Sequence, residues 1–237
     1  MRLDVYLTEN GMCKSRTAAQ SLIKSGGVSL NGKACAKPSQ EVAEADMVEI
    51  TVEQLRYAGR GGLKLEAALE QFRLDINGAE CIDIGSSTGG FTDCMLQHGA
   101  AKVFAVDVGR DQLVDFLRSD PRVVSMEQTD IRTAELPQVD FIGTDVSFIS
   151  LKLILPHIFR LLKSGGRAVA LIKPQFEAGK ANLSKKGIVR DERVRLKIRD
   201  DIAGFAQGCG FAVSGMAPSP ITGGDGNVEY LMCLEKG

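Results

Sequence analysis

The alternation of apolar strands with helical segments after residue 79 constrains the fold of this chain most strongly. Short runs rich in Val and Ile predict buried strands, and each is followed by a stretch with apolar residues at helical spacing. This order favours an α/β architecture: a doubly wound, mostly parallel sheet that binds ligands at the carboxyl ends of its strands. The predicted strands are 80–84, 102–108, 123–128, 139–145, 167–173, 212–216 and 228–234, and the predicted helices are 63–72, 91–98, 111–118, 151–163 and 190–207.

The first 55 residues form a separate, smaller α+β unit in this interpretation. Apolar spacing predicts helices over 2–10 and 15–25, the second of them ending at Gly26-Gly27. The pair Asn31-Gly32 is a strong hairpin signal, and 48–52 reads as a further strand. Residues 56–62, rich in glycine and arginine, are predicted to be a linker to a second domain over 63–237.

Hydropathy and cysteine usage exclude several classes of protein. The longest apolar runs are short, such as 168–172, whereas a spanning helix needs roughly 20 apolar residues. The first residues show no signal-peptide pattern, so a cytoplasmic location and no membrane partner are expected. Six cysteines without Cys-x-x-Cys spacing and only two histidines predict no metal site.

The formal net charge of −1 hides two basic segments. Residues 1–37 hold six basic and two acidic side chains, and residues 180–199 hold eight basic and two acidic ones. Solvated surfaces would explain both segments, but clustered cations also neutralise nucleic-acid phosphates. The predicted RNA contacts are Lys14, Arg16, Lys24, Arg60, Lys180, Lys185 and Lys186.

A glycine-rich turn between the strand at 80–84 and the next helix predicts a cofactor site. The dinucleotide fingerprint G-x-G-x-x-G fails here because Ser87 stands at its middle glycine. Asp83 precedes the turn, which suits a partly cationic ligand better than a pyrophosphate. A structural turn and an NAD-type site remain the alternatives. The turn residues predicted to bind the cofactor are Gly85, Ser86, Ser87, Thr88, Gly89, Gly90 and Phe91.

Three further carboxylates lie at the ends of the neighbouring predicted strands. Asp107 is predicted to accept hydrogen bonds from the hydroxyls of an adenosine ribose, and Asp130 to contact the adenine amino group. Asp145 ends the fourth strand and is expected at the same edge. Together with the glycine turn, these positions resemble the S-adenosylmethionine site of class I, Rossmann-like methyltransferases.

The residues at the other strand ends favour a hydroxyl as methyl acceptor. The fourth strand is not followed by Asp/Asn-Pro-Pro-Tyr, which is typical of amino-directed enzymes, and no cysteine follows a proline as in many cytosine C5 enzymes. A weakly acidic ribose 2′-OH needs a base, and a lysine can serve when burial and a second cation favour its neutral form. The predicted catalytic residues are Lys64, Asp145, Lys173 and Glu229, with Lys173 as base, Lys64 tuning it, and the carboxylates orienting both.

These four residues resemble the Lys-Asp-Lys-Glu tetrad of FtsJ-type 2′-O-methyltransferases. Nearly the whole chain is similar to the TlyA family, also called haemolysin A, through the segments 60–65, 85–91, 145–151, 173–180 and 226–230. The resemblance implies 2′-O-methylation of cytidine in ribosomal RNA, with S-adenosylmethionine as cofactor and ribosomal RNA or ribosomal subunits as partner.

The first 55 residues resemble the RNA-binding fold first seen in ribosomal protein S4, through 3–7, 15–28 and 48–50. In that family, basic residues of the second helix meet RNA phosphates. The target nucleotide is expected to be extruded from its helix. A membrane-active haemolysin and a non-catalytic RNA-binding assembly factor are the competing hypotheses. Oligomeric state is open.

Overall fold

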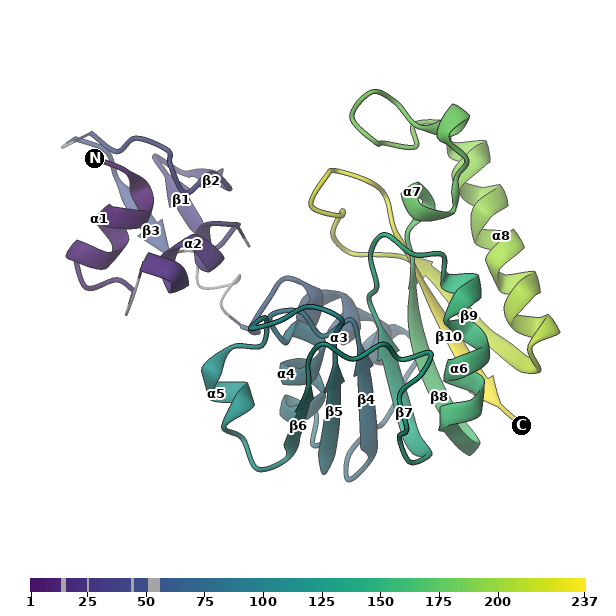
Figure 1. The fold of residues 1–237 in the computed structure, drawn as a ribbon. Coiled ribbons are helices and arrows are strands. Elements are labelled where there is room, and N and C mark those ends of the chain that lie inside the picture. Colours follow the sequence, from purple (N-terminus) through teal and green to yellow (C-terminus); the bar gives the residue numbers. More distant parts are fainter. Residues whose placement is uncertain (14–15, 25, 44, 51–55) are drawn as a thin grey trace. The chain divides into compact units, whose positions relative to one another are not determined.

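The computed structural model describes residues 1–13, 16–24, 26–43, 45–50 and 56–237 (Figure 1). The chain divides into two compact units, Met1–Arg60 and Gly61–Gly237. This division falls within the segment 56–62 that the sequence suggests as a linker. Lys14 and Ser15 lie outside the described residues.

The N-terminal unit packs two helices against a small antiparallel sheet. Helices α1 (Leu3–Glu9) and α2 (Arg16–Lys24) contact each other, and the strand order is β2-β1-β3. At the β1–β2 turn, Asn31 and Gly32 have φ of 52° and 73°, which confirms the predicted hairpin. The strands are β1 (Val28–Leu30), β2 (Lys33–Cys35) and β3 (Val48–Ile50). The core consists of Leu3, Leu7, Ala19, Ile23, Val28 and Val42.

The C-terminal unit contains a seven-stranded sheet with the order β6-β5-β4-β7-β8-β10-β9. The pairs from β6 to β8 are parallel, whereas β10 runs antiparallel to both β8 and β9. The predicted doubly wound, mostly parallel sheet is therefore confirmed. Its strands are β4 (Glu80–Ile84), β5 (Lys102–Val106), β6 (Val123–Met126), β7 (Val139–Thr144), β8 (Leu162–Ile172), β9 (Phe211–Pro218) and β10 (Tyr230–Lys236).

Helices cover both faces of this sheet (Figure 1). Helices α3 (Gly61–Gln71) and α4 (Gly90–Gln97) pack together on the face where Gly143 meets Met95 and Phe91. Helices α6 (Leu155–Leu161) and α8 (Glu192–Gly208) bury their apolar sides against the opposite face. The short elements are α5 (Asp115–Arg118), α7 (Pro174–Glu177) and the 3₁₀ turns η2 (Leu151–Leu153) and η3 (Lys180–Asn182).

Two predicted helices differ from the structure. The helix expected over 151–163 is split into η2 and α6, and residues from Leu162 onward belong to β8. A bulge in the β7–β8 pairing, between Val139 and Phe141, accommodates the turn at Gly165 (φ 75°). The helix expected over 111–118 begins only at Asp115, because the N–H groups of 111–113 donate to the Glu127 carboxylate instead.

Candidate active site

The four predicted catalytic residues come from four elements that meet at one edge of the sheet. Lys64 lies on α3, Asp145 directly follows β7, and Lys173 directly follows β8. Glu229 precedes β10, which is antiparallel, so the start of that strand lies beside the end of β8. The edge formed by the carboxyl ends of the parallel strands therefore collects all four side chains.

Direct contacts link the four side chains in a row of alternating charge. Lys64 Nζ donates to Glu229 Oε2 at 2.6 Å and lies 3.5 Å from Asp145 Oδ2. Lys173 Nζ lies 2.6 Å from Asp145 Oδ1. Asp145 thus stands between two cations, each of which holds one of its oxygens.

This row is largely removed from water. The exposed fractions of the side chains are 2% for Glu229, 9% for Lys64 and 10% for Lys173, against 17% for Asp145. Buried charges of this kind need partners, and two lysines with two carboxylates leave no net charge. Removing any one side chain would leave an uncompensated buried charge.

The glycine turn after β4 approaches the backbone of Asp145 closely. Gly85 has φ 85°, and a Cβ at this position would lie 2.9 Å from the Asp145 carbonyl oxygen. Gly89 has φ 99°, and a Cβ there would collide with Leu117. Both positions therefore need glycine, and the turn leads directly into the first turn of α4.

Asp83 is a buried carboxylate beneath this turn. Its Oδ2 accepts hydrogen bonds from the Thr92 N–H (2.9 Å) and the Thr92 hydroxyl (2.6 Å). Its Oδ1 is buried and has no hydrogen-bond partner among the described residues. Burial raises the pKa of Asp83 to about 7, against the opposing effect of the Thr92 hydrogen bonds.

The two other predicted cofactor carboxylates have different surroundings. Asp107 accepts the Ser87 N–H at 2.8 Å and the Gly109 N–H at 2.7 Å, which fixes its orientation beside the turn. Asp130 is paired with Arg132 at 2.6 Å, and this hydrogen-bonded partner lowers the pKa of Asp130 to about 2. Its side chain keeps 34% exposure. The Phe91 ring is buried in the core.

These residues fit S-adenosylmethionine chemically. The unpartnered Asp83 oxygen favours a cationic neighbour, and the oriented Asp107 carboxylate can accept from vicinal ribose hydroxyls. Gly85, Ser86, Thr88, Gly89 and Gly90 form a turn whose backbone a ligand can approach.

Two residues beside the tetrad were missed by the sequence reasoning. Ser147 accepts a hydrogen bond from Lys173 Nζ at 2.9 Å. Phe148 is 91% exposed and has φ 64°, and its ring centroid lies 5.0 Å from that of Phe176. A left-handed backbone at an aromatic residue leaves no signal in a single sequence.

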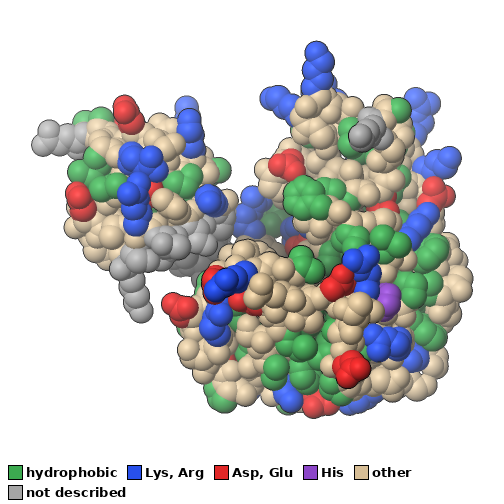
Figure 2. Space-filling model, viewed as in Figure 1, with side chains coloured by type: hydrophobic (Ala, Val, Ile, Leu, Met, Phe, Trp, Pro, Cys, Tyr) green, Lys and Arg blue, Asp and Glu red, His purple; other side chains and the backbone are tan. Residues whose placement is uncertain are grey.

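The predicted RNA contacts are placed in part. Arg16 is 54% exposed and bonds through Nε to the buried Asp4, and Lys24 is exposed in the last turn of α2. Lys185 and Lys186 are exposed on the turn closed by Ser184 and Gly187. Lys180 begins η3, and Arg60 is the last residue of the first unit. Figure 2 shows Lys and Arg side chains projecting from the segment between α7 and α8.

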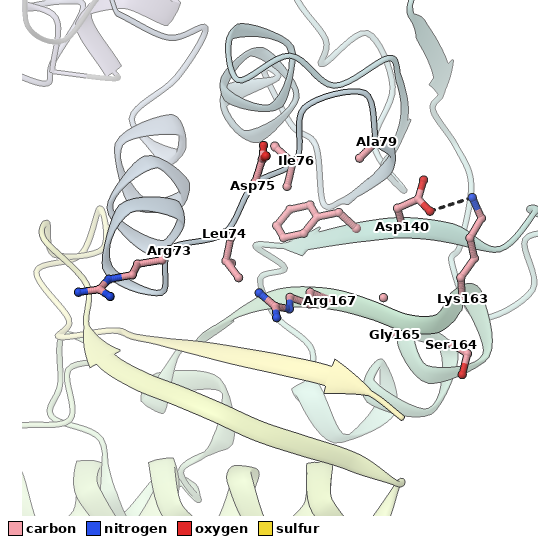
Figure 3. A pocket seen from close by; sticks show the side chains of 12 residues that line it. Arg73, Leu74, Asp75, Ile76, Ala79, Asp140, Lys163, Ser164, Gly165 and Arg167 are labelled. Carbon is pink, nitrogen blue, oxygen red and sulfur yellow. Dashed lines mark hydrogen bonds and ion pairs between the residues drawn. The ribbon is translucent and has the colours of Figure 1, made fainter.

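A cavity of about 460 Å³ lies at the opposite edge of the sheet (Figure 3). Its lining includes Arg73, Lys163 and Arg167, from the loop after α3 and the start of β8. Lys163 donates within this cavity to Asp140 at 2.9 Å. None of the predicted site residues lines this cavity.

Within the described parts of the chain, no helix is long and apolar enough to cross a bilayer. The same residues contain no group of three or more His, Cys, Asp or Glu side chains arranged to hold a metal ion.

Comparisons with known proteins identify the family of each unit. The model of the FtsJ-like methyltransferase family matches residues 57–236, and that of the S4 domain matches residues 1–48. The putative rRNA methyltransferase YqxC of Bacillus subtilis is 46% identical, over 98% of this chain and 85% of its own. The 16S/23S rRNA (cytidine-2'-O)-methyltransferase TlyA of Mycobacterium tuberculosis is 40% identical, over 98% of this chain and 89% of its own. A solved structure, a putative hemolysin from Streptococcus thermophilus, has a TM-score of 0.79 at 46% identity, covering 100% of this chain and 88% of that one.

Proposed function

Because the chain belongs to the FtsJ-like methyltransferase family and carries an S4 domain before its methyltransferase domain, we propose that it methylates the 2′-hydroxyl of cytidine in ribosomal RNA. S-adenosylmethionine is the methyl donor of this family and supplies an electrophilic methyl group when bound. The observation that supports the acceptor is the row Glu229–Lys64–Asp145–Lys173 at the carboxyl edge.

Lys173 is the base in this proposal. In its neutral form, its Nζ accepts the 2′-OH proton as the ribose oxygen becomes the nucleophile. Lys64 lies 3.5 Å from the same Asp145 carboxylate, so the two lysines share this one carboxylate between them. Glu229 holds Lys64 at 2.6 Å, and Ser147 fixes the direction of Lys173 Nζ.

The other predicted residues complete the site. In this proposal Asp107, Asp130 and the turn 85–91 hold the cofactor, and Asp83, buried beneath the turn, provides the carboxylate nearest to its cationic part. The exposed ring of Phe148 offers a stacking surface for the base of an extruded nucleotide. The aromatic ring and the tetrad then hold base and ribose of one nucleotide.

RNA docking falls to the basic surfaces of both units. Arg16 and Lys24 on α2, together with Lys14 and Arg60, contact phosphates through the domain 1–55 and the linker 56–62. Lys180, Lys185 and Lys186 contact phosphates beside the methyltransferase site. This substrate places the enzyme in the cytoplasm, where ribosomal subunits are found.

Methyl transfer to ribosomal subunits tests the proposal. The wild-type protein should transfer tritiated methyl groups from S-adenosylmethionine to subunits from cells that lack the gene, and nuclease mapping should find 2′-O-methylcytidine. Lys173→Ala should lower kcat by about 10²- to 10⁴-fold, because proton transfer to a positioned base contributes this much.

Lys163→Ala is the matched control, since this lysine is also ion-paired to an aspartate but lies at the opposite edge. It should keep wild-type activity. Full activity of a folded Lys173→Ala protein would refute the assignment of the base. Binding of RNA without binding of S-adenosylmethionine in calorimetry would favour the non-catalytic assembly factor.

A further inference from the structure

Glu177, at the end of α7, joins two segments that carry the reacting groups. One segment follows β7 and contains Asp145, Ser147 and Phe148; the other follows β8 and begins with Lys173. We propose that Glu177 is a positioning residue that clamps these two segments together and so sets the place of Lys173 and of Phe148. The inference rests on the proposed 2′-O-methylation.

The clamp consists of two short hydrogen bonds, one to each carboxylate oxygen. Ser150 Oγ donates to Glu177 Oε2 at 2.6 Å, and the Leu151 N–H donates to Oε1 at 2.6 Å. Ser150 is also the N-cap of η2, whose first backbone donors would otherwise lack acceptors. Hydrogen bonds to an ionised acceptor are the stronger kind, so Glu177 ties the start of η2 firmly to the end of α7.

Two further contacts join the same segments and depend on their spacing. Lys173 Nζ reaches Asp145 and Ser147, and the rings of Phe148 and Phe176 lie 5.0 Å apart. Phe176 directly precedes Glu177, and Phe148 lies two residues before Ser150. Movement at the clamp would therefore change both the lysine contact and the aromatic contact.

The backbone of Phe148 gives this clamp a function beyond general stability. An aromatic residue with φ 64° occupies a left-handed backbone region that is unfavourable for a side chain with a Cβ and persists only when its surroundings enforce it. The clamp at Ser150 and Leu151 supplies such enforcement from one side, and the Lys173–Ser147 contact supplies it from the other. The 91% exposed ring is thus held in place without being buried.

The clamp needs a side chain as long as glutamate that carries two hydrogen-bond acceptors, one for Ser150 and one for Leu151. A Gln at 177 keeps one acceptor oxygen, whereas an Ala removes both. Glu177→Ala should lower kcat about 10- to 100-fold, because small displacements of reacting groups have effects of this size. Glu177→Gln should show a smaller loss, and KM for S-adenosylmethionine should change less than twofold in both variants.

Asp140→Ala is the matched control for stability. Asp140 also accepts one backbone N–H (Glu80, 3.0 Å) and one side-chain donor (Lys163, 2.9 Å), but at the opposite edge of the sheet. The variant Asp140→Ala should lower the melting temperature by about as much as Glu177→Ala does, and it should leave kcat within twofold of wild type. Equal kcat values for these two variants would overturn the inference.

A fluorescence measurement tests the clamp without relying on catalysis. The chain has no tryptophan, so Phe148→Trp introduces a single reporter. Its time-resolved anisotropy should decay slowly with Glu177 present and gain a fast component in the double variant with Glu177→Ala. An unchanged decay would overturn the clamp. If the wild-type protein methylates neither ribosomal subunit, the proposed function fails, and the anisotropy still decides whether Glu177 holds the segment.

Discussion

Asp83 is a carboxylate whose place in the fold is unfavourable for its own charge. It is fully buried, one of its oxygens has no hydrogen-bond partner among the described residues, and its pKa is raised to about 7. Because the value in the folded protein lies above the ordinary 3.8, the folded state binds the proton more tightly than the unfolded state. The stability gained from this tighter proton binding is fully present below about pH 4 and is lost as the pH rises to about 7.

The variant Asp83→Asn should therefore be more stable than wild type at pH 8 when no cofactor is bound. The neutral amide oxygen of Asn can still accept hydrogen bonds from Thr92. The rise in the pKa of Asp83 in the wild-type protein corresponds to a loss of stability at high pH of at most about 4 kcal/mol. Calorimetric melting from pH 5 to 8 should show a steeper fall for wild type than for the variant.

Asp140→Asn serves as the control of opposite sign. The hydrogen bond from Lys163 lowers the pKa of Asp140. The stability that ionised Asp140 contributes is therefore present above the ordinary pKa of an aspartate and is lost on acidification. Parallel pH profiles for wild type and Asp83→Asn would contradict the prediction. The same Asp83→Asn protein should bind S-adenosylmethionine more weakly in calorimetry, since the cationic ligand loses its anionic neighbour.

The sequence placed Asp145, Lys173 and Glu229 at or beside predicted strand ends, which meet at one edge of the sheet, whereas Lys64 was assigned from a helix by its resemblance to the FtsJ-type tetrad. The tetrad residues indeed lie within direct contact, in the row from Glu229 to Lys173. Ser147, Phe148 and Glu177 could not be predicted in this way. Their roles depend on a left-handed backbone and on contacts between two loops, and neither has a periodic pattern in the sequence.

At the level of elements, the turn after β4 sets the position of Asp145. Gly85→Ala should destabilise the fold and also reduce methyl transfer, because its Cβ would push against the Asp145 carbonyl oxygen at 2.9 Å. Gly78→Ala is the control: its φ is 74°, but nothing lies within 4 Å of the added Cβ.

Chemical unfolding should show a loss for Gly78→Ala of about 1 kcal/mol, from backbone strain alone, and a clearly larger loss for Gly85→Ala. Only Gly85→Ala should lose activity. If the two variants behaved alike in both assays, close packing at Gly85 would have no bearing on the site.

The strands were predicted well because buried parallel strands appear as short, continuous apolar runs. The helices at 111–118 and 151–163 were overestimated for local reasons. The carboxylate of Glu127 takes the N–H groups of the first segment, and pairing of Leu162 with Val139 ends the second. Both effects come from residues distant in sequence, which a periodicity argument does not include.

At the scale of the whole molecule, the near-neutral net charge conceals two basic segments on an acidic remainder. Binding of ribosomal RNA should therefore weaken steeply with salt. The double variant Lys185→Ala, Lys186→Ala should lower the magnitude of the slope of log K against log salt concentration by about 1.5, since each phosphate contact contributes about 0.7 to 0.9.

Filter binding at several salt concentrations measures this slope. The pair Lys163→Ala, Arg167→Ala removes the same charge from the opposite edge and should leave the slope at its wild-type value. Equal slopes in all three proteins would remove Lys185 and Lys186 from the RNA interface.

The antiparallel placement of β10 has a consequence for the order in which the enzyme matures. Lys64 and Glu229 are 165 residues apart, and their hydrogen bond forms only after β10 inserts between β8 and β9. During synthesis from the N-terminus, the first unit leaves the ribosome long before this strand does. The proposed RNA docking therefore needs only the early part of the chain, whereas the proposed chemistry needs the complete row from Glu229 to Lys173.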